Sequence, residues 1–170
     1  ADLAKWARGD RDPQSYDAGI ERTRESYASL VGMAVDRVAH GSQTSVLTSL
    51  VAAAVPDGAE VLCADGDFAS IIFPFLQRSG IRVRTVALDV LAESITDDTW
   101  LVVFSRVQSA NGILADVPAI LEGARLHDTF TFCDTTQAAG VLPVDASLFD
   151  VTVCHTYKWL CSPRGVAFLT

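Results

Sequence analysis

The chain has 170 residues, 49% of them apolar, and a formal net charge of −8 at pH 7. This size and composition allow one substantial core, so we expect a single domain over residues 1–170, and the acidic chain without a basic stripe is not expected to bind nucleic acid. The longest apolar stretch, residues 46–55, is too short to span a bilayer and the N-terminus has no signal pattern, so we expect a cytoplasmic protein without a membrane partner.

The first half of the chain alternates between helical and strand patterns. Residues 1–16 are polar and carry turn signals, and the polar loop 40–45 leads into a buried helical stretch that Pro56-Asp57-Gly58 ends. Arg82 and Arg84 alternate with apolar residues, which predicts a strand near the edge of a sheet. The expected elements of this half are helices at 17–31, 46–54 and 69–78 and strands at 35–39, 60–64 and 82–88.

The second half continues the same alternation. Asp116 followed by Pro118 predicts the start of a helix, with Asp116 as its N-cap. Strands separated by helices predict a mostly parallel sheet covered on both faces, which is a three-layer α/β/α fold. The expected elements of this half are helices at 91–95 and 116–127 and strands at 100–105, 129–133, 151–154 and 166–169.

Polar clusters follow the expected strands at the points where the strands end. In open α/β sheets, ligands bind at the carboxyl ends of the strands. Several polar clusters at such positions therefore predict a ligand site at one edge of the sheet. The clusters are residues 40–45, 65–68, 105–112, 134–137 and 155–158.

Lys158 stands where a β-branched run, Val151 to Val153, opens into a polar loop. Lysine is rarely buried, and desolvation lowers the pKa of a buried lysine, which yields a neutral, nucleophilic amine suited to Schiff-base chemistry. A salt bridge or a phosphate contact would explain the same lysine. His155, taken alone, is more typical of a hydrogen-bonded core histidine.

Three further motifs each admit a functional and a structural interpretation. The stretch 41–44 opens a helix, where backbone N–H groups and hydroxyls suit a phosphate, or where a serine or threonine is simply the N-cap. Asp134 could hold a protonated ring nitrogen or a metal, or cap a helix. Phe68 could stack on a planar ring or belong to the core.

No metal site is expected, because the histidines and cysteines are not spaced as metal ligands and no two cysteines form a CxxC pair. We expect three buried thiols at strand ends and one thiol in a loop. The cysteines are Cys63, Cys133, Cys154 and Cys161.

Asp134 with Gln137, the run Tyr157-Lys158-Trp159-Leu160 and the turn Pro163-Arg164-Gly165 resemble the class V aminotransferase family. This family belongs to the fold-type I pyridoxal-phosphate enzymes and includes cysteine desulfurases, kynureninases and isopenicillin-N epimerase-like proteins. The resemblance, over residues 16–170, implies the large domain of a pyridoxal 5'-phosphate-dependent transferase and an amino-acid substrate.

The resemblance also implies a role for each matched residue. Lys158 would be the Schiff-base lysine, and Asp134 would pair with the pyridine nitrogen of the cofactor. The other implied cofactor contacts are the phosphate-binding Ser42, Gln43, Thr44, His155 and Tyr157, the ring-stacking Phe68, Gln137 near the phenolic oxygen or the Schiff base, and Ser109 near the ring oxygen.

Family members are longer, which implies that an N-terminal segment and a C-terminal small domain, with the family's substrate-carboxylate arginine, lie outside this chain. Tyr157 stands where desulfurases usually carry a histidine, which favours the aminotransferase-like and kynureninase-like branches. We therefore expect an aminotransferase-like homodimer, with a cysteine desulfurase or C–S/C–C lyase of the same family as the alternative. The rival from another class is a non-catalytic α/β module that binds a phosphorylated ligand, with Lys158 as a phosphate contact.

Overall fold

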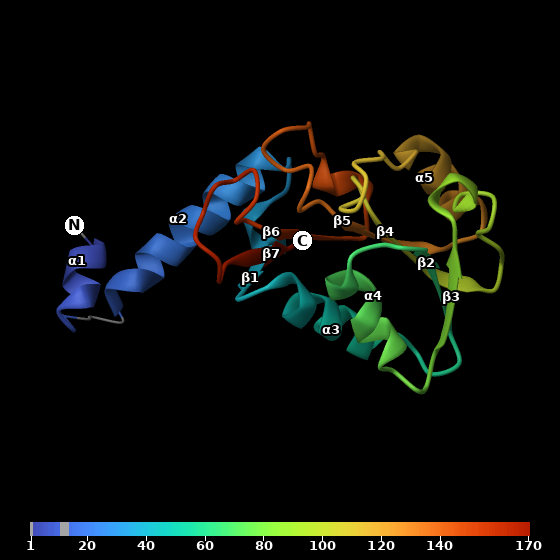
Figure 1. Ribbon diagram of the computed structural model, residues 1–170, viewed down its shortest axis with the longest axis horizontal. Helices are drawn as coiled ribbons and strands as arrows, with labels where there is room; N and C mark the ends of the chain where they lie inside the picture. The colour runs from blue at the N-terminus through green and yellow to red at the C-terminus, as the bar shows by residue number, and fades with distance from the viewer. Residues whose placement is uncertain (1, 11–13) are drawn as a thin grey trace.

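A seven-stranded sheet forms the middle layer of the computed structural model, which describes residues 2–10 and 14–170 (Figure 1). The strand order is β1-β7-β6-β5-β4-β2-β3. Strands β2 to β6 are parallel, whereas β7 is antiparallel to both of its neighbours, which confirms the mostly parallel sheet. The strands are β1 (Ala39–Gly41), β2 (Glu60–Ala64), β3 (Arg82–Val86), β4 (Thr99–Ser105), β5 (Phe130–Asp134), β6 (Val151–His155) and β7 (Ala167–Leu169).

The burial of each strand follows from its place in the sheet. The central strand β4 is almost entirely buried, as its run of bulky apolar residues predicts for a strand covered on both faces. The edge strand β3 has no fully buried residue, and Arg84 on it forms an ion pair with Glu60 of β2 at 2.8 Å. The prediction that this arginine-bearing strand lies at an edge is confirmed.

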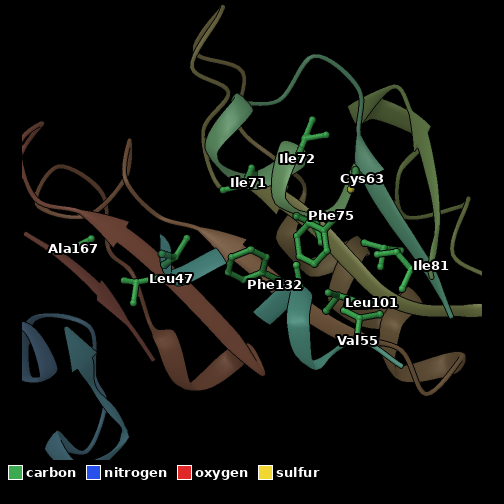
Figure 2. Packing of buried hydrophobic residues seen from close by; sticks show 14 residues of the cluster. Leu47, Val55, Cys63, Ile71, Ile72, Phe75, Ile81, Leu101, Phe132 and Ala167 are labelled. Carbon is green, nitrogen blue, oxygen red and sulfur yellow. The ribbon is translucent and has the colours of Figure 1, made fainter. Parts of the chain in front are cut away.

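Helices α3 (Thr44–Ala54) and α4 (Ala69–Leu76) cover one face of the sheet. Their apolar side chains pack against alternate strand residues, and the rings of Phe75 and Phe132 meet edge to face with centroids 6.1 Å apart (Figure 2). Because strand side chains point alternately to opposite faces, Val61 packs on this side and Leu62 on the other.

Helices α5 (Val117–Leu126) and α2 (Gln14–Leu30) cover the opposite face (Figure 1). Asp116 caps α5 as predicted, because its carboxylate accepts a hydrogen bond from the N–H of Ala119 at 3.1 Å. From α2, the ring of Tyr27 stacks on Phe168 of β7 with a centroid separation of 4.3 Å. The two helical layers and the sheet confirm the three-layer α/β/α fold.

Several local expectations are wrong. Residues Val35–Arg37 form a 3-10 turn (η1) instead of part of a strand. The Arg24 side chain of α2 donates hydrogen bonds to the carbonyl oxygens of Val35 and Val38, each at 2.8 Å, so these carbonyls do not pair with a strand. The short helix expected at 91–95 is replaced by the earlier 3-10 turn η2 (Leu88–Val90) and further turns.

The N-terminal region also differs from expectation. A helix, α1 (Asp2–Ala7), occupies part of the segment expected to be polar turns, and α2 starts before residue 17. The turn signal at residues 12–13 lies outside the described residues. A last 3-10 turn, η3 (Ala146–Leu148), was not expected, and the other element boundaries shift by at most two residues.

The cysteines are placed as predicted: Cys63, Cys133 and Cys154 are buried and Cys161 is exposed. Burial raises the pKa of Cys63 and of Cys154 to about 12, so both thiols are neutral core side chains. Within residues 2–10 and 14–170, no helix has both the length and the apolar character that a bilayer crossing requires.

Candidate functional site

A pocket of about 200 Å³ opens at the edge of the sheet where β2, β4, β5 and β6 have their carboxyl ends. The N-terminus of α3 also borders it, because β1 runs in the same direction as β6, both being antiparallel to β7. Ser42 is exposed and does not line the pocket. The pocket brings together the other residues predicted from the sequence, namely Gln43, Thr44, Phe68, Ser109, Asp134, Gln137, His155, Tyr157 and Lys158.

Lys158 lies in the turn that follows β6. Its Nζ is 5.5 Å from the centroid of the Phe68 ring and 6.0 Å from that of Tyr157, so the amine lies beside two aromatic rings. Burial lowers the pKa of Lys158, and the nearby Asp134 carboxylate partly opposes this effect. The amine is therefore neutral more readily than an exposed lysine, as nucleophilic chemistry requires.

The turn after Lys158 packs directly on Gly140. Gly140 has φ +94°, and a Cβ at this position would lie 2.9 Å from Cδ2 of Leu160 and 3.3 Å from the carbonyl oxygen of Trp159. Only glycine meets both demands, because it tolerates positive φ and leaves room for the neighbouring backbone. The position of the lysine turn thus depends on a residue in the loop after β5.

Asp134 is the last residue of β5, and its side chain is buried at the pocket. One carboxylate oxygen accepts a hydrogen bond from the N–H of Thr136 at 2.8 Å, and no helix begins here, so Asp134 is not a helix cap. Burial raises its pKa to about 6, hydrogen bonds from Thr136 lower it, Asp67 raises it and Lys158 lowers it. Its charge is therefore sensitive to any cation that enters the pocket.

Asp67, which sequence reasoning did not single out, ties the segment that carries Phe68 to the segment that follows β4. Its carboxylate accepts hydrogen bonds from the N–H and hydroxyl of Ser105, at 2.6 and 2.5 Å, and from the Gln108 amide at 3.0 Å. It also accepts a hydrogen bond from the N–H of Phe68 at 2.7 Å. This network holds the backbone of Phe68, whose ring lies beside Lys158. The only sequence signal for it was the Asp-Gly-Asp run before Phe68.

The N-terminus of α3 is not capped by a side chain. Gln43 is the N-cap residue and makes no side-chain cap hydrogen bond, and no acidic residue occurs in the first turn. The first-turn N–H groups and the positive end of the helix dipole therefore remain available to an anion beside Gln43 and the buried Thr44. The plain serine or threonine N-cap is thus wrong for this helix.

Two potential cations, His155 and Arg164, lie against the ring of Tyr157. The His155 ring meets the Tyr157 ring edge-on with centroids 4.5 Å apart, and the guanidinium carbon of Arg164 lies 4.5 Å from the Tyr157 centroid. Burial lowers the pKa of His155, as do the charges of Arg164 and Lys158. Within the described part of the chain, its buried Nδ1 has no hydrogen-bond partner.

Two remaining predicted residues contact each other, because the Gln137 amide donates to the Ser109 hydroxyl at 3.4 Å. Sequence reasoning did not assign four further lining residues to the pocket. They are Ser70, Ser105, Thr136 and Arg164.

Comparisons with known proteins agree on one family. The model of the family Aminotransferase class-V matches residues 10–170. Kynureninase from Deinococcus radiodurans is 30% identical over 177 residues, which cover 98% of this chain and 43% of that protein. Isopenicillin N epimerase from Amycolatopsis lactamdurans is 28% identical over 167 residues, which cover 86% of this chain and 42% of that protein.

Solved structures show the same fold. The cystine C-S lyase C-DES, in complex with its reaction product cysteine persulfide, matches with a TM-score of 0.85 and 23% identity, over 98% of this chain and 51% of that chain. The chain thus spans about half or less of the length of the proteins it resembles.

Proposed function

The chain belongs to the aminotransferase class-V family, and we propose that it forms the cofactor-binding part of an enzyme with aminotransferase-like activity on an amino acid. The cofactor of this family is pyridoxal 5'-phosphate. When bound, it supplies a ring that accepts negative charge developing at the α-carbon of an amino acid. The observation that carries the proposal is the convergence of Lys158, Asp134 and the uncapped N-terminus of α3 on one pocket.

The chemistry of the pocket residues fits this cofactor. The free N–H groups of α3 are donors that suit a phosphate, and the unpartnered Nδ1 of His155 donates to one in the tautomer that carries the proton there. The buried carboxylate of Asp134 suits a protonated ring nitrogen, since each charge favours the other in a desolvated site. The Phe68 side chain is 44% exposed, which leaves a face on which a flat ring can stack.

In this proposal, the pocket residues have distinct roles. Lys158 would hold the cofactor covalently through Nζ, and its amine would take up the proton from the substrate Cα. Asp134 keeps the proton on the ring nitrogen, and Phe68 holds the ring flat. We assign the phosphate to Gln43, Thr44, His155 and Tyr157, and the ring oxygen to Gln137 and Ser109; Ser42 remains a prediction from the resemblance alone.

The lysine content of the chain allows a sharp test, because Lys5 and Lys158 are its two lysines. Pyridoxal phosphate followed by borohydride should label Lys158, as located by mass spectrometry of the digested chain. Lys158→Arg should abolish this label, and the control Lys5→Arg should keep it. A label that stays in Lys158→Arg and disappears in Lys5→Arg would contradict the proposal. No label in either variant or in the wild type would instead favour the non-catalytic phosphate-binding module.

The residue before the lysine, Tyr157, favours the aminotransferase-like branch over a cysteine desulfurase or a C–S/C–C lyase. Products distinguish these activities, because keto acid without free ammonia, formed in the presence of a second keto acid as amino acceptor, marks transamination. Sulfide with alanine marks desulfuration, and keto acid with free ammonia marks a C–S lyase. We expect keto acid from the unreduced chain loaded with pyridoxal phosphate, in a preparation from which a separate sample carries the label on Lys158 after borohydride treatment. Sulfide release from cysteine without keto acid would assign the chain to the other branch.

We also propose that the protein acts as a homodimer. Its support is the apolar surface of the helices on the pocket side of the sheet, where Val46 and Leu50 of α3 and Phe73 and Leu76 of α4 are exposed. Large exposed apolar groups often mark protein–protein contacts. Sedimentation equilibrium should give a dimer, and Leu50→Glu should shift it toward the monomer. A monomer at all concentrations of the wild-type chain would contradict this part of the proposal.

A further inference from the structure

Arg164 is held at the pocket by a closed loop. The loop between Lys158 and β7 is fastened to Thr156 on both sides of Arg164. The carbonyl of Thr156 accepts from the N–H of Ser162 at 3.2 Å, and its N–H and hydroxyl donate to the carbonyl of Val166 at 3.1 and 2.9 Å. The Thr156 and Ser162 hydroxyls are also hydrogen-bonded to each other. Because Thr156 is buried, this loop has a fixed base.

The guanidinium of Arg164 lies over the Tyr157 ring, so its plane is already supported on one side. Within residues 2–10 and 14–170, no carboxylate lies within ion-pair distance of it. The guanidinium lines the pocket together with His155 and Lys158. An oriented arginine without an acidic partner keeps its donors free for a ligand.

The charges around Arg164 also call for an anion. Burial lowers the pKa of His155, and the positive charges of Arg164 and Lys158 lower it further, because they disfavour a third positive charge beside them. Among the described residues that line the pocket, Asp134 is the one carboxylate, and it faces Lys158. An anion beside Arg164 would relieve this repulsion in a chain whose overall charge is −8.

We propose that Arg164 is an anion-binding residue of this pocket, where its guanidinium holds either the phosphate of the cofactor or the carboxylate of the amino-acid substrate. The two candidate anions rest on the proposed function; the anion site itself rests on the geometry. A guanidinium fork matches both groups, because each presents two oxygens in one plane. The α3 N-terminus offers a second anion site, so the pocket provides one for each group.

The test compares Arg164→Gln with Arg125→Gln on the 170-residue chain. Arg125 is exposed in the last turn of α5, directly before β5 starts, and therefore lies toward the opposite edge of the sheet. Both variants remove one positive charge from the surface, and far-ultraviolet circular dichroism checks their folding. The phosphate probes are pyridoxal phosphate, compared with pyridoxal, and inorganic phosphate. The carboxylate probe, used on the loaded chain, is L-alanine, compared with L-alaninol, which lacks the carboxylate.

If Arg164 binds the phosphate, Arg164→Gln should lower the affinity of the chain for pyridoxal phosphate and for inorganic phosphate by about tenfold or more. Its affinity for pyridoxal should stay unchanged. If it binds the carboxylate, pyridoxal phosphate should bind as before. The affinity of the loaded chain for L-alanine should fall by the same factor, and its affinity for L-alaninol should not change. Arg164→Lys should restore part of the affinity, since it keeps the charge and loses the fork.

The proposal is wrong if Arg164→Gln binds every probe with the same affinity as Arg125→Gln does. It is also wrong if the wild-type chain binds each anionic probe no more tightly than the matching neutral one. Borohydride labelling of Lys158 in the same preparations separates this outcome from failure of the proposed function. If Lys158 is labelled and Arg164→Gln has unchanged affinity for the anionic probes, only the role proposed for Arg164 is wrong. Weakened phosphate binding without any label at Lys158 removes only the enzymatic assignment.

Discussion

Replacing Asp134 with asparagine should stabilise the cofactor-free chain near neutral pH. The side chain is buried, and burial raises its pKa from the ordinary 3.8 to about 6. This difference of about two pH units corresponds to about 3 kcal/mol between the protonated and ionised forms. Asparagine has the shape of the protonated acid and can keep the hydrogen bond from the Thr136 N–H.

The sign of the effect follows from proton release. Below about pH 4 the Asp134 carboxyl is neutral in the folded and unfolded chain, so both variants have similar free energies of unfolding. Between about pH 4 and 6 the unfolded chain loses the proton first, and the wild type loses stability as the pH rises. Above about pH 6 the loss is complete, and Asp134→Asn should be more stable by about 3 kcal/mol.

Urea unfolding at half-unit steps from pH 4 to 8, followed by tryptophan fluorescence, measures this difference. Asp116→Asn is the control, because asparagine caps a helix as well as the exposed Asp116 does, and its effect should be small at every pH. The reasoning would be refuted if Asp134→Asn raised the free energy of unfolding equally at pH 4.5 and 7.5, or if it lowered this free energy at pH 7.5. With pyridoxal phosphate bound, the wild type should be the more stable of the two, since the protonated ring nitrogen pairs with the ionised carboxylate of Asp134.

Two further substitutions test the framework of the pocket. Asp67→Ala should lower the free energy of unfolding by about 3 kcal/mol, because it leaves the buried donors of Ser105 and Gln108 without an acceptor; a loss below about 1 kcal/mol in urea titrations would argue against the network. Gly140→Ala should cost about 2 kcal/mol, from its positive φ and the contact with Leu160, and should weaken pyridoxal phosphate binding in fluorescence titrations. Unchanged affinity would mean that the lysine turn does not depend on this contact.

The pattern of the sequence predicts most of the fold because the central strands are continuous apolar runs bounded by turns. The same pattern predicts Lys158, Asp134 and Phe68 at the pocket, since strand ends meet at one edge of a parallel sheet. It cannot show that Asp67 bonds to Ser105, because this contact joins residues far apart in the chain and depends on how the strands are ordered.

Local misses have similar causes. Residues 35–39 have the composition of a strand, but Arg24 from another element takes their carbonyl groups. Ser42 matches a phosphate-binding motif, yet α3 begins at Thr44, which leaves Ser42 ahead of the N-cap and exposed. Arg164 was matched only as part of the turn Pro163-Arg164-Gly165 and received no role, because its place at the pocket follows from the hydrogen bonds that Thr156 makes across its loop.

The antiparallel strand β7 affects the order in which the site can assemble. In the described sheet, β1 is an edge strand that pairs with β7 alone, through Ala39 with Leu169 and Gly41 with Ala167. During synthesis β1 emerges early and has no partner strand until Leu169 has left the ribosome. The loop that leads into α3 therefore gains its support late, after a long-range closure that is slow by its contact order. Cofactor capture should consequently follow synthesis instead of accompanying it.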